Sequence, residues 1–596
     1  MRRSRWFMAG SWALLAFACS QKESTPAVSP SGPLAASSTY TDASARGEAK
    51  GEEEARADSP AESAEADAAP VAASSPEVAR PAPAPAAARA SGSAMKKMKP
   101  GSAAMPIAPA PTAAPPSFNT EAYSRVVDNQ FVSPRTSPLS TFSVDVDTAS
   151  YSNVRRFLEQ GALPPADAVR IEELVNYFSY DYPDPQGQEP FSVTTELSAA
   201  PWNPEHRLLL VGVQGKRIAQ QALPPRNLVF LVDVSGSMNE PNKLPLLKYA
   251  LRELVNSLDG KDRVSLVVYA GASGVVLEPT AANDKQRILS ALDRLEAGGG
   301  TNGADGINTA YALAERAFDP RGVNRVVLAT DGDFNVGVSS EGDLLRLIEH
   351  KRQKGVSLSV LGFGMGNYKD ATLEKLADHG NGNYAYIDSR AEARKVLVEQ
   401  GGSTLVTIAK DVKIQVEWNP AHVASYRLIG YENRALSAQD FNDDKKDAGD
   451  IGAGHSVTAL YELIPPGAPT AASGVDPLKY QTTRENGAAK SSELATIKLR
   501  YKRPRTDTSL LTSLVVADDA RPLARTSDNF RFASAVAGFG MLLRKSEYRG
   551  SATYALSRKL AEGARGNDRG QYRAGFIDLL ARAEQLDPSA LVKAAR

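Results

Sequence analysis

Apolar runs alternate with amphipathic stretches in the middle of the chain, between residues 226 and 400. The runs NLVFLVDV, RVSLVVYA, NRVVLAT and VSLSVLGFG are typical of strands, and stretches such as KLPLLKYALRELVNSL (243–258) have helical periodicity. Strands that are apolar throughout are buried on both faces, and their alternation with helices is typical of a doubly wound fold. The pattern therefore predicts an α/β, Rossmann-like domain over residues 223–402.

Strands of a second kind flank this domain. DVKIQVEW (411–418) and ATIKLRYK (495–502) alternate apolar and polar residues, and PFSVTTEL (190–197) and HRLLLVGV (206–213) are also typical of strands. Such alternation indicates strands with one buried face, as in an antiparallel sheet or sandwich. Because the two groups lie on either side of the α/β domain, we expect them to share one sheet and to form a discontinuous β-sandwich-like domain.

Helical periodicity appears at both ends of this region. Ile171, Leu174 and Phe178 share one face of an expected helix, and Phe532 and Val536 share one face of another. We therefore expect helical N- and C-terminal segments, the latter either as a small cap or packed on the β-domain.

Two aspartates near the first of these helices allow two interpretations. Asp145 and Asp147 alternate with valines in STFSVDVDTAS and so share one face of a strand. They could form a second cation site, but a solvated strand edge is the preferred interpretation.

The start of the chain has the composition of a targeting segment. Residues 1–5 are basic, and residues 6–18 are apolar but fewer than the about 20 that a membrane-spanning helix needs. The Ala-Cys pair that follows resembles a bacterial lipoprotein cleavage site, where the cysteine becomes lipidated. We expect a lipid anchor on Cys19 and a place in the cell envelope, and Ser20 favours the outer membrane, facing the periplasm or the cell surface. Simple secretion with an incidental cysteine is the alternative.

Residues 20–117 are rich in Ala, Pro, Ser, Glu and Gly and contain almost no aromatic residue. Such a segment cannot bury enough apolar surface to offset the entropy of ordering, so we expect a long disordered tether. The chain as a whole has 69 basic and 69 acidic residues, which argues against nucleic acid as a partner. Its single cysteine excludes an intramolecular disulfide.

Oxygen-bearing side chains stand at three places where strands of the α/β domain are expected to end or helices to begin. They are Asp233, Ser235, Ser237, Thr301 and Asp331. Ligands of open α/β sheets bind at the carboxyl ends of the strands, so these side chains are expected to meet there. Turn and helix capping would explain one such loop, but three loops that converge on one sheet edge are typical of a metal site.

This pattern, D-x-S-x-S followed by a distant Thr and a distant T-D-G, resembles the metal-ion-dependent adhesion site of the von Willebrand factor type A (VWA) domain. The flanking regions, including STFSVDVDTASYSNVRRFL, resemble the companion segments of a family of bacterial VWA-domain lipoproteins. The resemblance implies that the five side chains bind a divalent cation. The expected organisation is a signal peptide (1–19), a linker (20–117), a VWA-associated segment of helices then strands (118–222), a VWA domain (223–402), a β-rich domain (403–524) and a helical region (525–596).

The donor types fit the implied chemistry. Two carboxylates balance the charge of a divalent cation, and neutral hydroxyls leave it electrophilic enough to take a carboxylate from a partner. Hydroxyl-rich six-coordination favours Mg²⁺, with Mn²⁺ and Ca²⁺ as alternatives. We therefore expect a protein-binding module anchored in the envelope, whose partner is a protein with an exposed Asp or Glu.

Two other functions remain as alternatives. The first is a metal-independent scaffold lipoprotein of the envelope. The second, and the least expected, is a hydrolase, because no histidine lies near the two serines in the sequence and the five histidines form no motif. No phosphate-binding G-x-x-x-x-G-K-[ST] loop is present either. The chain is therefore expected not to be an enzyme.

Overall fold

The computed structural model describes residues 121–589, apart from residues 146, 272, 300–302, 333–339, 366–368, 402–404, 469–478 and 480–484. The predicted signal peptide with Cys19, all of the predicted tether, and Thr301 lie outside the described residues. All described residues belong to one structural unit, residues 109–596.

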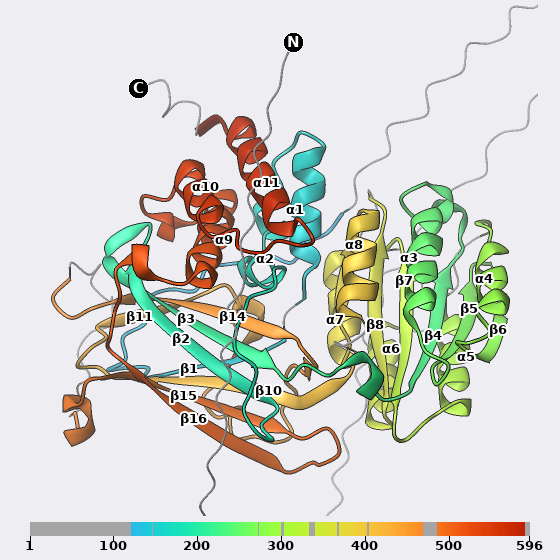
Figure 1. Cartoon of the computed structure of the whole chain (residues 1–596), viewed down its shortest axis with the longest axis horizontal. Coiled ribbons are helices and arrows are strands. Elements are labelled where there is room, and N and C mark those ends of the chain that lie inside the picture. Colours follow the sequence, from blue (N-terminus) through green and yellow to red (C-terminus); the bar gives the residue numbers. More distant parts are fainter. Residues whose placement is uncertain are drawn as a thin grey trace, which may run out of the picture. The chain divides into compact units, whose positions relative to one another are not determined.

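A six-stranded sheet occupies the middle of the chain, in the spatial order β6-β5-β4-β7-β8-β9 (Figure 1). Its strands are β4 (Arg226–Asp233), β5 (Arg263–Tyr269), β6 (Ser273–Ala281), β7 (Val323–Thr330), β8 (Val356–Phe363) and β9 (Tyr384–Ile387). All neighbours pair in parallel except β6, which is antiparallel to β5. This is the strand order of a doubly wound sheet, with its switch point between β4 and β7, and it confirms the predicted fold class.

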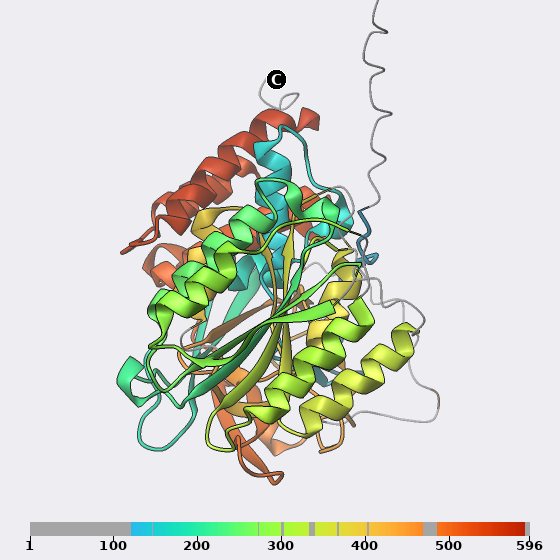
Figure 2. The same ribbon diagram turned by 90° about the vertical axis from the view of Figure 1, so that its right-hand side faces the viewer.

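Helices cover both faces of this sheet (Figure 2). The helices on one face are α3 (Leu244–Ser257), α4 (Lys285–Asp293) and α8 (Arg390–Arg394). Those on the other are α5 (Gly303–Arg316), α6 (Glu341–Gln353) and α7 (Asp370–His379). Phe230 and Val232 of β4 belong to the first core and Val229 and Leu231 to the second. This two-sided burial is why β4 is apolar throughout.

Two antiparallel sheets form a sandwich beside the α/β domain. Their orders are β11-β14-β3-β2 and β12-β1-β10-β15-β16, with β13 paired to β10. The strands are β1 (Leu139–Ser143), β2 (Phe191–Ala200), β3 (Asn203–Gly215), β10 (Thr407–Trp418), β11 (Ser425–Ile429), β12 (Ala435–Leu436), β13 (Ile451–Gly452), β14 (Ser456–Ile464), β15 (Glu493–Lys502) and β16 (Ser509–Ala517). One apolar core joins the sheets, with Leu209 and Val211 from the first and Ile414 and Val416 from the second.

The β-domain is discontinuous, as predicted, because β3 before the α/β domain pairs with β14 after it. The expectation that all flanking strands share one sheet is wrong for β10 and β15, which lie in the other sheet together with β1. The physical reason is that alternation of apolar and polar residues shows which face of a strand is buried but not which sheet the strand joins.

Helices from both ends of the described chain pack together in one core (Figure 1). They are α1 (Ala149–Glu159), α2 (Ile171–Asn176), α9 (Asp528–Arg544), α10 (Tyr554–Glu562) and α11 (Tyr572–Leu586). Leu208 and Leu210 of β3 belong to the same core, so these helices cover the outer face of one sheet. The C-terminal helices are thus packed on the β-domain, one of the two arrangements expected. None of the helices within the described residues combines the length and the hydropathy that crossing a membrane requires.

Candidate functional site

The carboxylates of Asp233 and Asp331 flank the switch point of the parallel sheet. Asp233 is the last residue of β4, and Asp331 directly follows β7. Ser235 and Ser237 stand in the turn after β4; Ser235 is buried like the two carboxylates, whereas Ser237 is exposed. The structure thus places four of the five predicted donors at one sheet edge, and we call Asp233, Ser235, Ser237 and Asp331 the metal centre.

Backbone hydrogen bonds hold the turn after β4 in place. The Val234 amide donates to the Tyr269 carbonyl at 3.0 Å, and the Gly298 amide donates to the Val234 carbonyl at 2.7 Å. The Gly236 amide donates to the carbonyl of Gly299, which has a φ of 86° in the left-handed region that favours glycine. The turn that carries the serines is therefore fastened to residues 298–299, the start of the second loop that the sequence singled out.

Hydrogen bonds from three sides orient Asp233. Its Oδ1 accepts from the Ser235 amide at 2.9 Å, and its Oδ2 accepts from the Tyr269 hydroxyl at 3.1 Å and the Thr330 hydroxyl at 3.3 Å. Burial raises the pKa of Asp233, and the neighbouring charge of Asp331 adds to the rise. Two adjacent buried carboxylates favour a bound cation, because a cation removes both the desolvation penalty and the repulsion.

The remaining atoms of the metal centre fit a Mg²⁺ ion. The hydroxyl oxygens of Ser235 and Ser237 are 3.0 Å apart. Adjacent ligands of an octahedron with metal–oxygen distances of about 2.1 Å are separated by about 3.0 Å. Asp331 Oδ1 is buried and has no hydrogen-bond partner among the described residues. An unsatisfied buried acceptor costs about 1–3 kcal/mol, so a cation at this oxygen would be stabilising.

Lys243, which the sequence analysis missed, places a positive charge beside the metal centre. Its buried Nζ lies 3.1 Å from Asp331 Oδ2. Gly364, at a φ of 76°, makes room for it, because a Cβ at this position would overlap the lysine side chain. A lysine just before a helix is usually solvated, so nothing in the pattern around Lys243 indicates this role. Tyr269 and Thr330 were also missed, although Thr330 directly precedes Asp331 in the T-D-G motif.

The described residues contain no group of three or more His, Cys, Asp and Glu side chains arranged to hold a metal ion. The metal centre differs from such groups because it combines two carboxylates with hydroxyls. No hydrogen bond within the described residues joins a histidine to Ser235 or Ser237. The hydroxyls of these serines interact with each other. The geometry accordingly presents the two serine hydroxyls as adjacent oxygen donors.

The doubly wound sheet and the oxygen donors at its switch point define a VWA domain. Residues 227–400 match the family model described as "von Willebrand factor type A domain", and residues 117–210 match the model described as "von Willebrand factor". Residues 403–586 match the model described as "Uncharacterized protein YfbK, C-terminal".

The chain belongs to the YfbK family of VWA-domain proteins. It is 43% identical over 479 residues to "Uncharacterized protein YfbK" of Escherichia coli (strain K12), which covers 78% of this chain and 81% of that protein. The resemblance found in the sequence is therefore confirmed for the VWA domain and for a family of VWA-domain proteins, whereas the lipid anchor stays a prediction.

Other relatives are less similar in sequence. Inter-alpha-trypsin inhibitor heavy chain H4 of Homo sapiens is 32% identical over 169 residues, 26% of this chain and 18% of that protein. The solved structure of "von Willebrand factor type A from Catenulispora acidiphila" is 18% identical, covers 66% of this chain and 91% of that chain, and has a TM-score of 0.37. VWA domains in general are protein-interaction modules rather than enzymes, and this sets the class of function.

Proposed function

We propose that the protein captures an acidic side chain of a partner protein through a divalent cation held at the metal centre. The observation that carries the proposal is the buried Asp331 Oδ1, an acceptor without a partner among the described residues. It lies at the sheet edge that also presents the hydroxyls of Ser235 and Ser237 at the spacing of octahedral ligands.

The chemistry of the donor set determines what can be captured. Asp233, Ser235, Ser237 and Asp331 would hold the ion, with Thr301 as the fifth donor. Bound Mg²⁺ supplies a hard, electrophilic centre that prefers oxygen ligands, and Mn²⁺ and Ca²⁺ are the alternatives. Two carboxylates only balance its charge, so one further carboxylate from outside is favourable. Exposure of Ser237 leaves an approach for that carboxylate from the solvent.

The proposal includes a lipid anchor on Cys19, with the VWA domain presented on a long tether from a membrane of the cell envelope, the outer membrane by preference. A basic start, a short apolar run and the Ala-Cys pair support the anchor. Cys19→Ala should move the protein from the membrane fraction of cells to the soluble fraction. Retention of this variant in the membrane fraction would exclude the anchor.

Two measurements test the metal-dependent function. Titration of the full chain with Mg²⁺ should show uptake that Asp233→Ala weakens at least about tenfold. Capture of envelope proteins by the wild type should then require Mg²⁺, disappear with EDTA and return when Mg²⁺ is restored. The matched control is Asp305→Asn, which changes an exposed aspartate of α5 close to the Thr301 loop and should leave both results unchanged. Absence of Mg²⁺ uptake by the wild type would refute the proposal.

One observation favours the metal-independent scaffold as a second candidate. Lys243 Nζ already gives Asp331 a positive partner, so part of the negative charge at the sheet edge is neutralised without a metal ion. Under this alternative, the captured proteins are the same with Mg²⁺, with EDTA and in Asp233→Ala.

A further inference from the structure

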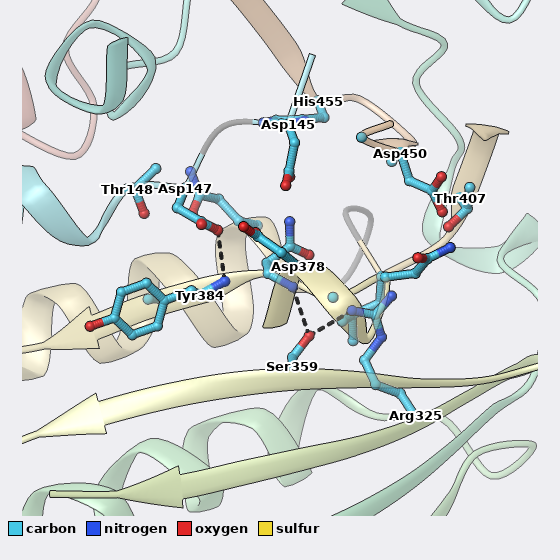
Figure 3. Close-up of a pocket in the computed structure, with 18 of the residues that line it drawn as sticks. Asp145, Asp147, Thr148, Arg325, Ser359, Asp378, Tyr384, Thr407, Asp450 and His455 are labelled. Atoms are coloured by element: carbon cyan, nitrogen blue, oxygen red, sulfur yellow. Dashed lines mark hydrogen bonds between the residues drawn. The ribbon is translucent and has the colours of Figure 1, made fainter. Parts of the chain in front are cut away.

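A cavity of about 330 Å³ lies between the α/β domain and the β-sandwich, and we call it the junction cavity (Figure 3). Its volume falls within the range of about 300–1,000 Å³ that small-molecule sites occupy. It is distinct from the metal centre. Arg325, in its wall, is the third residue of β7, whereas Asp331 follows the end of that strand. Arg325 and Asp331 are six steps apart along extended chain, or about 20 Å.

One wall of the junction cavity presents a guanidinium without an anion. Arg325 is 3% exposed, and its Nη1 donates to the Ser359 hydroxyl at 2.6 Å. Its Nε has no hydrogen-bond partner, and no described carboxylate lies within ion-pair distance of it. Burial lowers the pKa of Arg325 to about 10, which leaves it charged at neutral pH.

Among the described carboxylates, Asp450 is the one whose charge acts on Arg325. Burial raises the pKa of Asp450 to about 7, so it is a weak counter-ion. A buried guanidinium without a full anionic partner is costly, and an anion that enters the cavity would remove that cost. The flat guanidinium and the adjacent Ser359 hydroxyl suit a carboxylate, which accepts two parallel hydrogen bonds.

On the opposite wall of the junction cavity, carboxylates outnumber cations. Asp145, Asp147 and Asp378 surround the single guanidinium of Arg434, at 3.4, 3.2 and 2.5 Å, and Glu374 also binds it at 3.0 Å. Asp147 is buried, so the expectation of a solvated strand edge is wrong. The reason is that β1 ends at Ser143 and the chain then turns into the junction between the domains.

Asp145 and Asp378 contact the same nitrogen of Arg434, and burial raises the pKa of Asp378 to about 7, with the charge of Asp145 as the next cause. Asp378 Oδ1 has no donor among the described residues. Carboxylates in excess over cations must hold a shared proton or bind a positive group. An ammonium group supplies both the charge and the hydrogen-bond donors that this wall lacks.

Apolar side chains also line the junction cavity. Leu228, Val327, Leu361 and Leu397 line the cavity. Leu397 belongs to residues Lys395–Gln400, which form a π-helix, a rare form that is frequently found at functional sites. Figure 3 shows Arg325 reaching into the cavity from the sheet and Asp145 from the opposite side.

We propose that the junction cavity binds a small amino carboxylate, a molecule with a carboxylate and an ammonium group joined by a short aliphatic chain. Arg325 and Ser359 receive the carboxylate, Asp145 and Asp378 receive the ammonium group, and the leucines contact the methylenes between them. This site does not depend on the metal-dependent capture of a partner, because it shares no residue with the metal centre.

Calorimetric titration of the full chain with matched probes tests the charge pattern. The amino carboxylates are glycine, β-alanine, γ-aminobutyrate and ε-aminocaproate, which differ only in the length of the chain. Hexanoate and hexylamine each carry one of the two charges. At least one amino carboxylate should bind about tenfold or more tightly than either single-charge probe. Equal binding of hexanoate and the best amino carboxylate would overturn the two-wall assignment, and so would absence of binding by every probe.

Variants assign each wall to one end of the ligand. Arg325→Met should weaken the best amino carboxylate about 10- to 150-fold, and Asp378→Asn should weaken it while hexanoate binding is unchanged. Arg321→Met is the matched control, because this exposed arginine on the same segment pairs only with Asp319 and should not alter binding. Wild-type affinity in Arg325→Met would refute the role of the guanidinium.

Hydrogen exchange of the wild type keeps the test independent of whether a variant folds. Residues 446–450 and 381–385 line the cavity. Their amides should exchange more slowly with the best amino carboxylate than with buffer alone. Unchanged exchange of both segments at saturating ligand would overturn the proposal even if a binding signal is seen.

Discussion

The metal centre and the junction cavity lie at opposite ends of β7 and handle buried charge in opposite ways. The metal centre has two carboxylates beside the single cation Lys243, and its open donors are oxygens. In the junction cavity the unpaired charges lie on opposite walls. On one wall, Arg325 is a guanidinium without an ion-pair partner among the described residues, and on the other, carboxylates outnumber cations around Arg434. An excess of negative charge alone fits a simple cation, whereas a positive wall facing a negative wall fits a ligand with two oppositely charged ends.

The two regions also differ in how the chain builds them. The described donors of the metal centre come from the ends of β4 and β7, two adjacent strands of one sheet. The walls of the junction cavity come from segments near residues 145, 325, 378, 434 and 450, on both domains. A change in the metal centre should therefore act locally, whereas a change in the cavity should affect how the two domains hold together.

The largest effect should follow from Arg434→Met. The change leaves the buried Asp147 and the partly exposed Asp378 without their guanidinium, which should lower the free energy of unfolding by about 3–5 kcal/mol in urea denaturation. The Mg²⁺ affinity of the metal centre should not change. Arg217→Met removes an exposed pair with Asp184 and should cost less than about 1 kcal/mol. Equal effects of the two variants would show that the ion pairs of Arg434 contribute no more to the free energy of unfolding than an exposed ion pair does.

Asp450→Asn should alter the pH dependence of stability. An unfolded aspartate titrates near pH 4 and folded Asp450 near pH 7, so the folded chain binds one more proton in between. The stability that this proton provides is complete below about pH 4 and is lost as the pH rises to about 7. Between pH 5 and 6.5 the wild type should thus lose about 2 kcal/mol relative to the variant.

Urea denaturation across this pH range measures the difference for Asp450→Asn. Asp343→Asn changes a fully exposed carboxylate and serves as the control. If the wild type and Asp450→Asn keep parallel pH profiles, the pKa of Asp450 is not raised.

The smallest effect should come from Lys243→Met. The variant removes a positive charge 3.1 Å from Asp331, so Mg²⁺ no longer competes with it for that carboxylate. The Mg²⁺ affinity should rise about five- to tenfold in calorimetry, or about 1 kcal/mol. Lys375→Met, at an exposed pair with Glu341, should leave it unchanged. A lower affinity in Lys243→Met would mean that the lysine supports the ligand geometry instead of competing with the ion.

Local patterns predict which described side chains of the metal centre share one sheet edge, but they do not predict which side chains meet in the junction cavity. Asp233 and Asp331 follow apolar strands, and a parallel sheet brings such ends to one edge, so their proximity follows from periodicity alone. Nothing local predicts that Asp145 and Arg434 meet, because this contact depends on how the sandwich packs against the α/β domain. For the same reason alternation predicted the strands of the β-domain but not their division between two sheets.

The insertion of the VWA domain has a mechanical consequence. The chain enters that domain after β3 and leaves it before β10, and these strands belong to different sheets of the sandwich. Leu223 in the first connection and Val406 in the second pack in one apolar cluster. Tension applied at the carboxyl ends of β4 and β7 is therefore shared between two chain connections, and these connections contact each other. Cleavage of either connection alone would leave the VWA domain joined to the sandwich by the other connection.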